Sequence, residues 1–485
     1  MVSTQNPMSQ SLESDVEART ATISKSRDNE RGSSVHSSKT PQLTKIRQSL
    51  GGDIAIFLVA FGAGVTIASA LHDASYVEAH SLNGLIVLFS RFSALIGTYL
   101  VLVSLLMIAR IPWVEHSVGY DRLVAYHRQL GPVTLSLIAL HVVLIVIGYA
   151  RSDGKSIIGE LNTLVFVYAW MIPAALAFII MAVIAFSSAN RVRRKLAYET
   201  WWNLHILSYL AIALAFMHQI MTGSLFIFNE FAKIWWIALY IYTAFAMVAW
   251  RFVLPVVRSF RHRLFVDHVD QESNNVVSVY ICGRKLDAIH AHGGNFFEWR
   301  FLTKGIWSQA HPYSLSAPPT ENMMRITVKN LGDHSWALSK LTPGIRVVAE
   351  GPYGTLTAAR AIGSKVLLVG GGVGITPLRA LMEDFPINAE IDLIYRVIHE
   401  DELVLKSELD ALDISERIRV HYLVGPPEMF PLSPEDLLKL IPHIAECDVF
   451  VCGPPGLAKI VRHSVESLGV KSSKFHNEAF AFHAG

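Results

Sequence analysis

The sequence predicts an all-α membrane bundle of six helices, followed by a cytosolic antiparallel β-barrel and then an α/β domain with a parallel sheet. Three observations support this fold class. The 485 residues are 52% hydrophobic, with a mean hydropathy of +0.37, which is too apolar for an ordinary soluble enzyme. Nearly all the long apolar runs lie between residues 53 and 254, and lipid is the solvent that suits them. After residue 263, short alternating strands with turn residues take over.

The composition outside the apolar region excludes several classes of partner. Residues 1–50 are rich in Ser, Thr and Arg and poor in aromatics, which predicts a disordered cytosolic tail rather than a signal peptide. The 42 Lys and Arg against 40 Asp and Glu give a net charge of +2, so nucleic acid is not an expected partner. The three cysteines are too few for a disulfide framework and lack metal-ligand spacing. The half that carries them therefore suits a reducing compartment.

Six apolar stretches each approach the ~20 residues that a spanning helix needs. Basic residues such as Arg110, Arg191 and Arg258 gather in the second and fourth connections and after the sixth stretch. The positive-inside rule then places both termini in the cytoplasm of a multi-pass protein of the cell (plasma or inner) membrane, with residues 51–258 as the transmembrane domain. The stretches are residues 53–71, 84–109, 129–150, 162–187, 203–224 and 234–254.

Two of these stretches, which run in the same direction, each carry a pair of histidines. His127 and His141 lie fourteen residues apart, and His205 and His218 thirteen apart. At ~1.5 Å per residue each pair spans about 20 Å of helix, so His127 is level with His205 and His141 with His218. Ionisable residues inside a bilayer are costly and mark function, and neutral imidazole is an axial ligand of haem iron. The pattern predicts two haems, one near each leaflet.

The alternative for these histidines is hydrogen bonding between packed helices. Fourteen residues return an ideal helix to within about 40° of the same face, whereas thirteen leave it roughly 140° out of phase. Arg91, inside the second stretch, needs an anionic partner in that setting. A haem propionate near the outer leaflet is the predicted partner, and a backbone carbonyl is the alternative.

The region after the spans predicts two domains. Residues 276–281 and 325–329 alternate in polarity, which indicates a small antiparallel barrel over 259–361. Residues 365–369 form an apolar strand that enters a glycine-rich turn and a helix, the arrangement that brings backbone N–H groups onto a pyrophosphate. A second apolar strand, 448–451, enters a similar turn. A Rossmann-like domain is therefore predicted over 362–485, with its turns formed by Gly370, Gly371, Gly372, Gly374 and Thr376, and by Cys452, Gly453 and Pro454.

The stretch from His311 to Ser316 resembles the flavin signature of the ferredoxin reductase superfamily, with His in place of the usual Arg. Joined to six spans with two histidine pairs, the chain from about residue 53 to its end resembles the ferric reductase and NADPH oxidase family in its bacterial-type form. The resemblance implies a transmembrane flavocytochrome. It would pass electrons from cytosolic NADPH or NADH through FAD and two b-type haems to an acceptor on the opposite side.

The resemblance also implies roles for individual residues. The flavin would contact the signature, and its phosphates would contact the segment after the next strand. The nicotinamide nucleotide would contact the two glycine-rich turns, where Cys452 would also lie beside the reacting centre. Gly425, Pro426 and Pro427 lack the basic residue expected in an NADPH site, so NADH stays open. The implied residues are His311, Pro312, Tyr313, Ser314, Lys329 and Ser335 for FAD, Arg396 for the 2′-phosphate, and Phe482 or Phe480 as the terminal aromatic over the flavin.

The final acceptor is left open by the sequence. In superoxide-forming members of the family a histidine one turn beyond the outer ligand lines an oxygen pocket, and here that position is Ile145. Oxygen, a ferric chelate and an extracytoplasmic redox protein are three alternatives, and a non-enzymatic haem-binding membrane protein is a fourth. Apart from the lipid bilayer and a small-molecule acceptor, no obligatory partner is expected.

Overall fold

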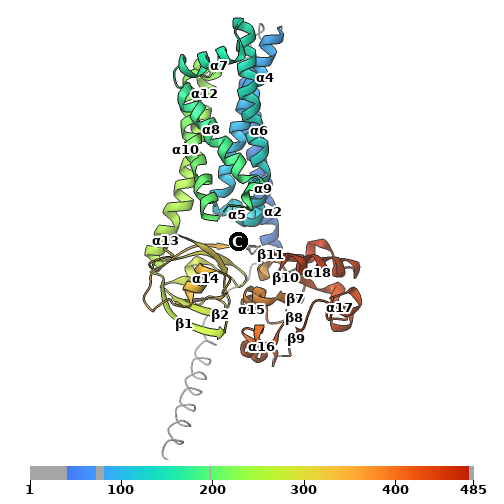
Figure 1. Ribbon diagram of the computed structural model, residues 1–485. Coiled ribbons are helices and arrows are strands. Elements are labelled where there is room, and N and C mark those ends of the chain that lie inside the picture. Colours follow the sequence, from blue (N-terminus) through green and yellow to red (C-terminus); the bar gives the residue numbers. More distant parts are fainter. Residues whose placement is uncertain (1–40, 73–80, 197, 308, 415, 480–485) are drawn as a thin grey trace, which may run out of the picture. The chain divides into compact units, whose positions relative to one another are not determined.

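The computed structural model describes residues 41–72, 81–196, 198–307, 309–414 and 416–479 (Figure 1). Residues 1–40 of the predicted tail, and both Phe480 and Phe482, lie outside the described residues. From Lys45 onward the described chain forms one compact unit, which contains the membrane helices and the sheets. Helix α2 (Pro41–His72) begins inside the segment predicted to be disordered, so residues 41–50 are helical and that part of the prediction is wrong. Proline is favoured in a first helical turn.

Six described helices are long and apolar enough to cross a bilayer, which confirms the predicted number. Figure 1 shows the long helices running alongside one another. Helix α4 is the most enclosed of them and packs mainly against α6. The helices that follow α2 are α4 (Leu82–Ile108), α6 (Tyr120–Asp153), α8 (Met171–Ser188), α10 (Tyr198–Thr222) and α12 (Glu230–Val248), the last continuing through a π-helical turn (Ala249–Val253) into α13 (Leu254–His262).

The fourth predicted stretch is divided in the structure. Helix α7 (Ile157–Phe166) ends early, and α8 begins only at Met171, after Trp170 adopts a left-handed conformation with φ of 65°. Pro173 has no N–H to donate to the carbonyl four residues earlier, so a continuous helix would lose a hydrogen bond there. The prediction of one helix over 162–187 is therefore wrong, although a spanning helix follows the break.

Two three-stranded antiparallel sheets follow the membrane helices. Buried Phe297, Trp299 and Ile326 belong to the core that both sheets share. Isolated bridges join the sheets, between Phe265 and Arg346 and between Leu315 and Ile326. The antiparallel prediction is confirmed, whereas closure into a barrel stays a prediction. The sheet orders are β1 (Phe265–Ser273), β2 (Val276–Cys282), β5 (Met323–Lys329), and β4 (His311–Ser314), β3 (Phe296–Phe301), β6 (Val347–Tyr353).

The last part of the described chain is a five-stranded parallel sheet with helices packed on both faces. The strand order is β11-β10-β7-β8-β9, so the chain reverses direction across the sheet between β7 and β10. Open α/β sheets bind ligands at that switch point, outside the carboxyl ends of the strands. The elements are β7 (Lys365–Gly371), α15 (Ile375–Asp384), β8 (Glu390–Val397), α16 (Lys406–Asp413), β9 (Ile418–Val424), α17 (Pro434–Leu440), β10 (Asp448–Gly453), α18 (Pro455–Ser467) and β11 (Phe475–Ala479).

Candidate functional site

The structure brings the four predicted histidines together in two pairs between α6 and α10. The ring centroids of His127 and His205 are 6.0 Å apart, with their planes at 86°. His141 and His218 also lie near each other. The thirteen-residue spacing on α10 therefore does not prevent the pairing that the sequence predicts.

Two serines on α4 contact the histidines of α6. The Ser104 hydroxyl oxygen is 2.7 Å from Nδ1 of His127, and the Ser90 hydroxyl oxygen is 2.9 Å from Nδ1 of His141. The serines are fourteen residues apart, as are the histidines, so one helix holds both imidazoles at their depths. Sequence reasoning missed these serines, and the equal spacing on neighbouring spans was the signal that could have found them.

The hydrogen-bond geometry of three histidines favours the tautomer with the proton on Nδ1. Nδ1 of His141 lies 3.1 Å from the Ser90 carbonyl oxygen, and Nδ1 of His127 lies 3.2 Å from the Ser104 carbonyl oxygen. A carbonyl oxygen only accepts, so both Nδ1 atoms donate and each Nε2 keeps its lone pair. At His218, the Thr222 hydroxyl donates to the His218 carbonyl oxygen at 2.6 Å, which leaves its oxygen to accept from Nδ1 at 2.8 Å. An unprotonated Nε2 is the atom that binds a metal.

The inner pair has dimensions that fit one metal ion between two rings. A metal–imidazole bond is about 2 Å and each ring adds about 1 Å to its centre, so two rings whose centroids are 6.0 Å apart could both reach one ion. Within the described ranges, no group of three or more His, Cys, Asp or Glu side chains could hold a bare ion. The donor set therefore fits haem iron, which brings its own equatorial ligands.

Arg91 lies on α4 directly after Ser90, the residue that contacts His141. It is therefore near the level of the outer histidine pair, in the half of the span where the sequence predicts it. Its contact with a haem propionate stays a prediction.

The predicted flavin residues lie on strand β4. Ser314 is only 4% exposed, and its hydroxyl oxygen has no hydrogen-bond partner among the residues that the structure describes. Buried polar atoms are normally paired, so this one fits contact with a bound molecule. Burial raises the pKa of Tyr313, and the His311 ring lies 6.4 Å from the Tyr313 ring with planes at 17°.

The two predicted phosphate ligands have other partners in this structure. Nζ of Lys329 is 2.9 Å from a carboxylate oxygen of Glu402, which belongs to the nucleotide-binding part. The Ser335 hydroxyl oxygen accepts from the N–H of Gly332 at 3.0 Å, and Ser335 lies in the first turn of the short helix α14 (Asp333–Leu338). Flavin phosphates would share or replace these contacts, and both roles stay predictions.

The two glycine-rich turns meet at the switch point of the parallel sheet. A Cβ on Gly374 would lie 2.2 Å from the Cys452 carbonyl oxygen, and one on Gly453 would lie 3.2 Å from Cα of Gly371. Only glycine permits this approach. Helix α15 starts directly after the first turn, and the Thr376 hydroxyl donates to the Val373 carbonyl oxygen at 3.0 Å. A helix N-terminus at such a turn suits a pyrophosphate.

Two further residues complete the carboxyl edge of the sheet. Arg396 lies near the end of β8, opposite Gly371, and within the described chain one of its terminal nitrogens is buried without a hydrogen-bond partner. Glu478, which sequence reasoning missed, pairs with Cys452 in the register of β10 and β11. Burial, and next the Glu478 carboxylate, raise the pKa of the Cys452 thiol. Cys452 is therefore a neutral thiol and not a nucleophile. Only strand pairing places Glu478 there, so no local pattern marked it.

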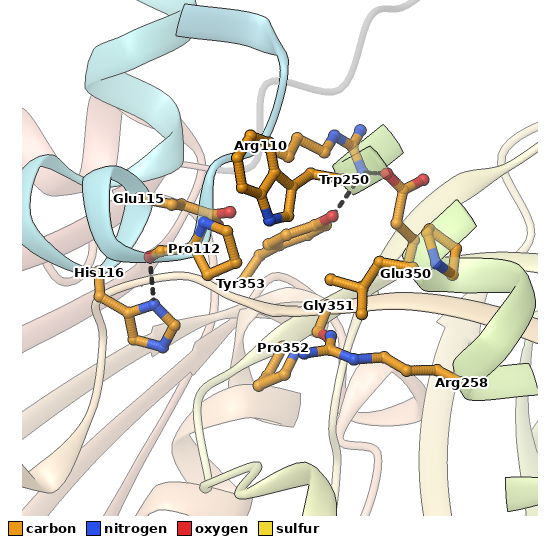
Figure 2. Close-up of a pocket in the computed structure, with 12 residues that line it drawn as sticks. Arg110, Pro112, Glu115, His116, Trp250, Arg258, Glu350, Gly351, Pro352 and Tyr353 are labelled. Atoms are coloured by element: carbon orange, nitrogen blue, oxygen red, sulfur yellow. Dashed lines mark hydrogen bonds and ion pairs between the residues drawn. The ribbon is translucent and has the colours of Figure 1, made fainter. Parts of the chain in front are cut away.

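Figure 2 shows Arg110, just after α4, reaching into the sheet that carries β4. Its guanidinium contacts Glu350 at 2.8 Å and Glu298 at 3.3 Å, and it donates to the Tyr353 hydroxyl at 2.9 Å. The ring of Tyr120, from the start of α6, is 5.3 Å away. The side chain is only 5% exposed. One buried cation thus connects the membrane helices to the predicted flavin sheet.

Two family models match parts of this chain. Residues 93–216 match the family model described as "Ferric reductase like transmembrane component", and residues 368–463 match "Oxidoreductase NAD-binding domain". The chain thus carries a ferric-reductase-like transmembrane domain and an oxidoreductase NAD-binding domain. The first match includes three of the four histidines and ends two residues before His218. The resemblance found in the sequence is confirmed for these joined domains, and the non-enzymatic alternative has no support.

Individual curated relatives match about a third of this chain. NADH-cytochrome b5 reductase 1 of Coccidioides immitis is 29% identical over 172 residues, covering 31% of this chain and 56% of the relative. The glycine betaine monooxygenase reductase subunit of Chromohalobacter salexigens is 30% identical over 183 residues, covering 34% and 49%. The chain thus spans about half the length of these relatives. A solved FAD/NAD-binding domain of nitric oxide dioxygenase from Vibrio cholerae is 22% identical, covers 45% of this chain and 98% of that chain, and has a TM-score of 0.38.

Proposed function

We propose that this oxidoreductase carries electrons from cytosolic NADPH or NADH, through FAD and two b-type haems, to an acceptor on the opposite side of the membrane. The observation that supports this most directly is the pairing of four histidines at two depths between α6 and α10. Three of them keep Nε2 unprotonated through hydrogen bonds at Nδ1.

The cofactors would supply the electron chemistry: a flavin accepts a hydride and releases single electrons, which haem iron accepts one at a time. In this proposal the inner haem is held by His127 and His205 and the outer haem by His141 and His218, with Arg91 at an outer propionate. The nucleotide is held by the two glycine-rich turns and Arg396. The flavin residues are His311, Pro312, Tyr313, Ser314, Lys329 and Ser335, with Phe482 or Phe480 as its cover.

The residues of the chain would bind and orient rather than act as acids or bases. Each imidazole pair would hold its haem iron with two ring nitrogens, so an acceptor would be reduced without binding the metal. The apolar spans exclude water between the two pairs, and Arg110 fixes the flavin sheet below α4. The basic connections favour a cytoplasmic position for both termini. The proposed domains are residues 51–258, 259–361 and 362–485.

The acceptor is proposed to be a small molecule, either a ferric chelate or oxygen. Ile145 stands where an oxygen pocket would need a histidine, which favours the chelate. An extracytoplasmic redox protein is the alternative, since the proposed outer haem needs only an exposed edge. Reduction of a ferric chelate under nitrogen, compared with superoxide formation in air, distinguishes the two small molecules.

A reduced-minus-oxidised spectrum tests the proposal. Purified protein should contain two haems and one FAD per chain, and NADPH or NADH should reduce both haems. Protein that binds no haem in its folded state would contradict the proposal.

Sealed vesicles test the direction of transfer. Outward movement of one electron costs about 2.3 kcal/mol for each 100 mV of opposing potential. An uncoupler should therefore raise the rate in sealed vesicles and have no effect on protein in detergent. An unchanged rate in tight vesicles would exclude transfer across the membrane.

A further inference from the structure

The four histidines differ in how their second ring nitrogen is satisfied. Nδ1 of His127, His141 and His218 each has a hydroxyl within 2.9 Å. Nδ1 of His205 is buried and has no hydrogen-bond partner in the described part of the chain. The inner pair therefore contains one histidine with such a contact, whereas the outer pair contains two.

A tryptophan ring stacks on the face of the His205 imidazole. The Trp201 ring is 5.1 Å from the His205 ring between centroids, with planes at 19°. Trp201 is itself held at two points: its Nε1 donates to the Ser188 hydroxyl at 3.2 Å, and the Arg193 guanidinium lies 4.5 Å from its ring centroid. A guanidinium at this distance is a cation–π contact, so the indole has a fixed orientation against the imidazole.

We propose that Trp201 positions His205 by stacking, and that the two haem sites differ in potential because His205 lacks a hydrogen bond at Nδ1. This rests on the proposed haem function. A hydrogen bond from Nδ1 makes Nε2 a stronger electron donor to the metal, which stabilises oxidised iron. The outer site has two such ligands and the inner site has one. The inner site therefore has the higher midpoint potential and is reduced first.

The positive charge of Arg193 also raises the midpoint potential of the inner site. Arg193 is held against Trp201, on the side of the bundle that carries the inner pair. A cation in a medium of low dielectric favours the site that has gained an electron. Trp201 is thus a positioning residue: it acts on the iron through His205 and through the cation that it holds.

Spectroelectrochemistry of the full-length protein, with haem counted per chain, tests this proposal. Trp201→Leu should lower the higher of the two midpoint potentials or lose one haem of the two, whereas Trp201→Phe, which keeps a stacked ring, should retain both haems and both potentials. Trp202→Leu is the matched control, because the Trp202 ring is more distant at 6.5 Å and tilted by 31°. It should move neither readout.

A variant of the outer site tests the hydrogen-bond argument separately. Thr222→Val removes the hydroxyl at Nδ1 of His218 with little change of shape, and should raise the lower potential and narrow the gap. Two haems with unchanged potentials in both Trp201→Leu and Thr222→Val would overturn the inference while leaving the proposed function intact. Unmodified protein without haem would instead overturn the proposed function. If Trp201→Leu does not fold, the proposal is tested with Thr222→Val and Arg193→Gln instead. Arg193→Gln should lower the higher of the two midpoint potentials.

Discussion

The membrane helices and the parallel sheet prepare their sites in opposite ways. In the bundle the functional atoms belong to side chains, and side chains of a neighbouring helix hold them, as Ser90 and Ser104 hold His141 and His127. In the sheet the functional surface is backbone, and it exists because side chains are missing from Gly374 and Gly453. We therefore expect the site in the bundle to be sensitive to deleted side chains and the site in the sheet to be sensitive to added ones.

Deletion of a ligand in the bundle should have the largest effect. His141→Leu removes one ligand of the outer pair, so haem per chain should fall from two to one. Loss of a residue that only supports a metal ligand costs about 10–100-fold, and loss of the ligand should cost at least that in acceptor reduction. The pyridine haemochrome measures the content, and His268→Leu on exposed strand β1 is the control. Two haems retained in His141→Leu would remove the basis of the comparison.

Arg110 lies where the two regions meet, and its removal should have the next largest effect. Arg110→Met leaves the carboxylates of Glu298 and Glu350 without their cation, and breaking such a buried pair costs about 3–5 kcal/mol. We expect a lower melting temperature and slower haem reduction by flavin in stopped flow, with haem reduction by dithionite unchanged.

A double variant tests whether charge or packing explains the stability lost in Arg110→Met. Adding Glu350→Gln to Arg110→Met should recover part of the lost stability, because one uncompensated charge is removed. A double variant less stable than Arg110→Met would show that Arg110 acts through packing and not through charge.

An added methyl group should disturb the sheet and spare the bundle. In Gly374→Ala the new Cβ would lie 2.2 Å from the Cys452 carbonyl oxygen, and overpacking of this kind costs about 1–3 kcal/mol. The KM for NADPH should rise by about tenfold, since tenfold corresponds to about 1.4 kcal/mol. Gly456→Ala, whose Cβ would meet nothing within 4 Å, should behave as the unmodified protein. An equal KM in both variants would refute the close approach.

The smallest expected effect comes from the opposite end of the parallel sheet. Burial by itself would raise the pKa of Asp392, but the Arg419 guanidinium and the His421 ring more than offset this and hold that pKa well below its usual range. The stabilisation is fully present above the unfolded pKa of about 3.9 and is lost as pH falls through the folded pKa.

Asp392→Asn should therefore lower the free energy of unfolding at pH 7 by about 1–3 kcal/mol, with less difference below about pH 4. Melting temperatures measured against pH check this. Because Asp392 is remote from the glycine-rich turns, the KM for NADPH should not change. If the difference in melting temperature between Asp392→Asn and the unmodified protein stays constant down to pH 3, the charge of Asp392 is not the cause of the lost stability.

Several features could be predicted from local patterns alone. Hydropathy marks the spanning helices because a helix in lipid must satisfy its backbone within itself and present apolar side chains. The spacing of His127, His141, His205 and His218 along two such helices then sets their depths by helix geometry. The turn after β7 is equally local, since adjacent glycines serve one strand and one helix. The break at Trp170 was missed, although Pro173 was its local signal.

The remaining features come from contacts between residues distant in sequence. The register of α4 against α6 sets Ser90 and Ser104 on two imidazoles, and the pairing of β10 with β11 sets Glu478 beside Cys452. Hydropathy and composition alone could identify the membrane helices and a nucleotide-binding turn. Packing assigned each imidazole its neighbours, because a side chain's partners depend on how helices and strands come together, and one-dimensional spacing does not contain that information.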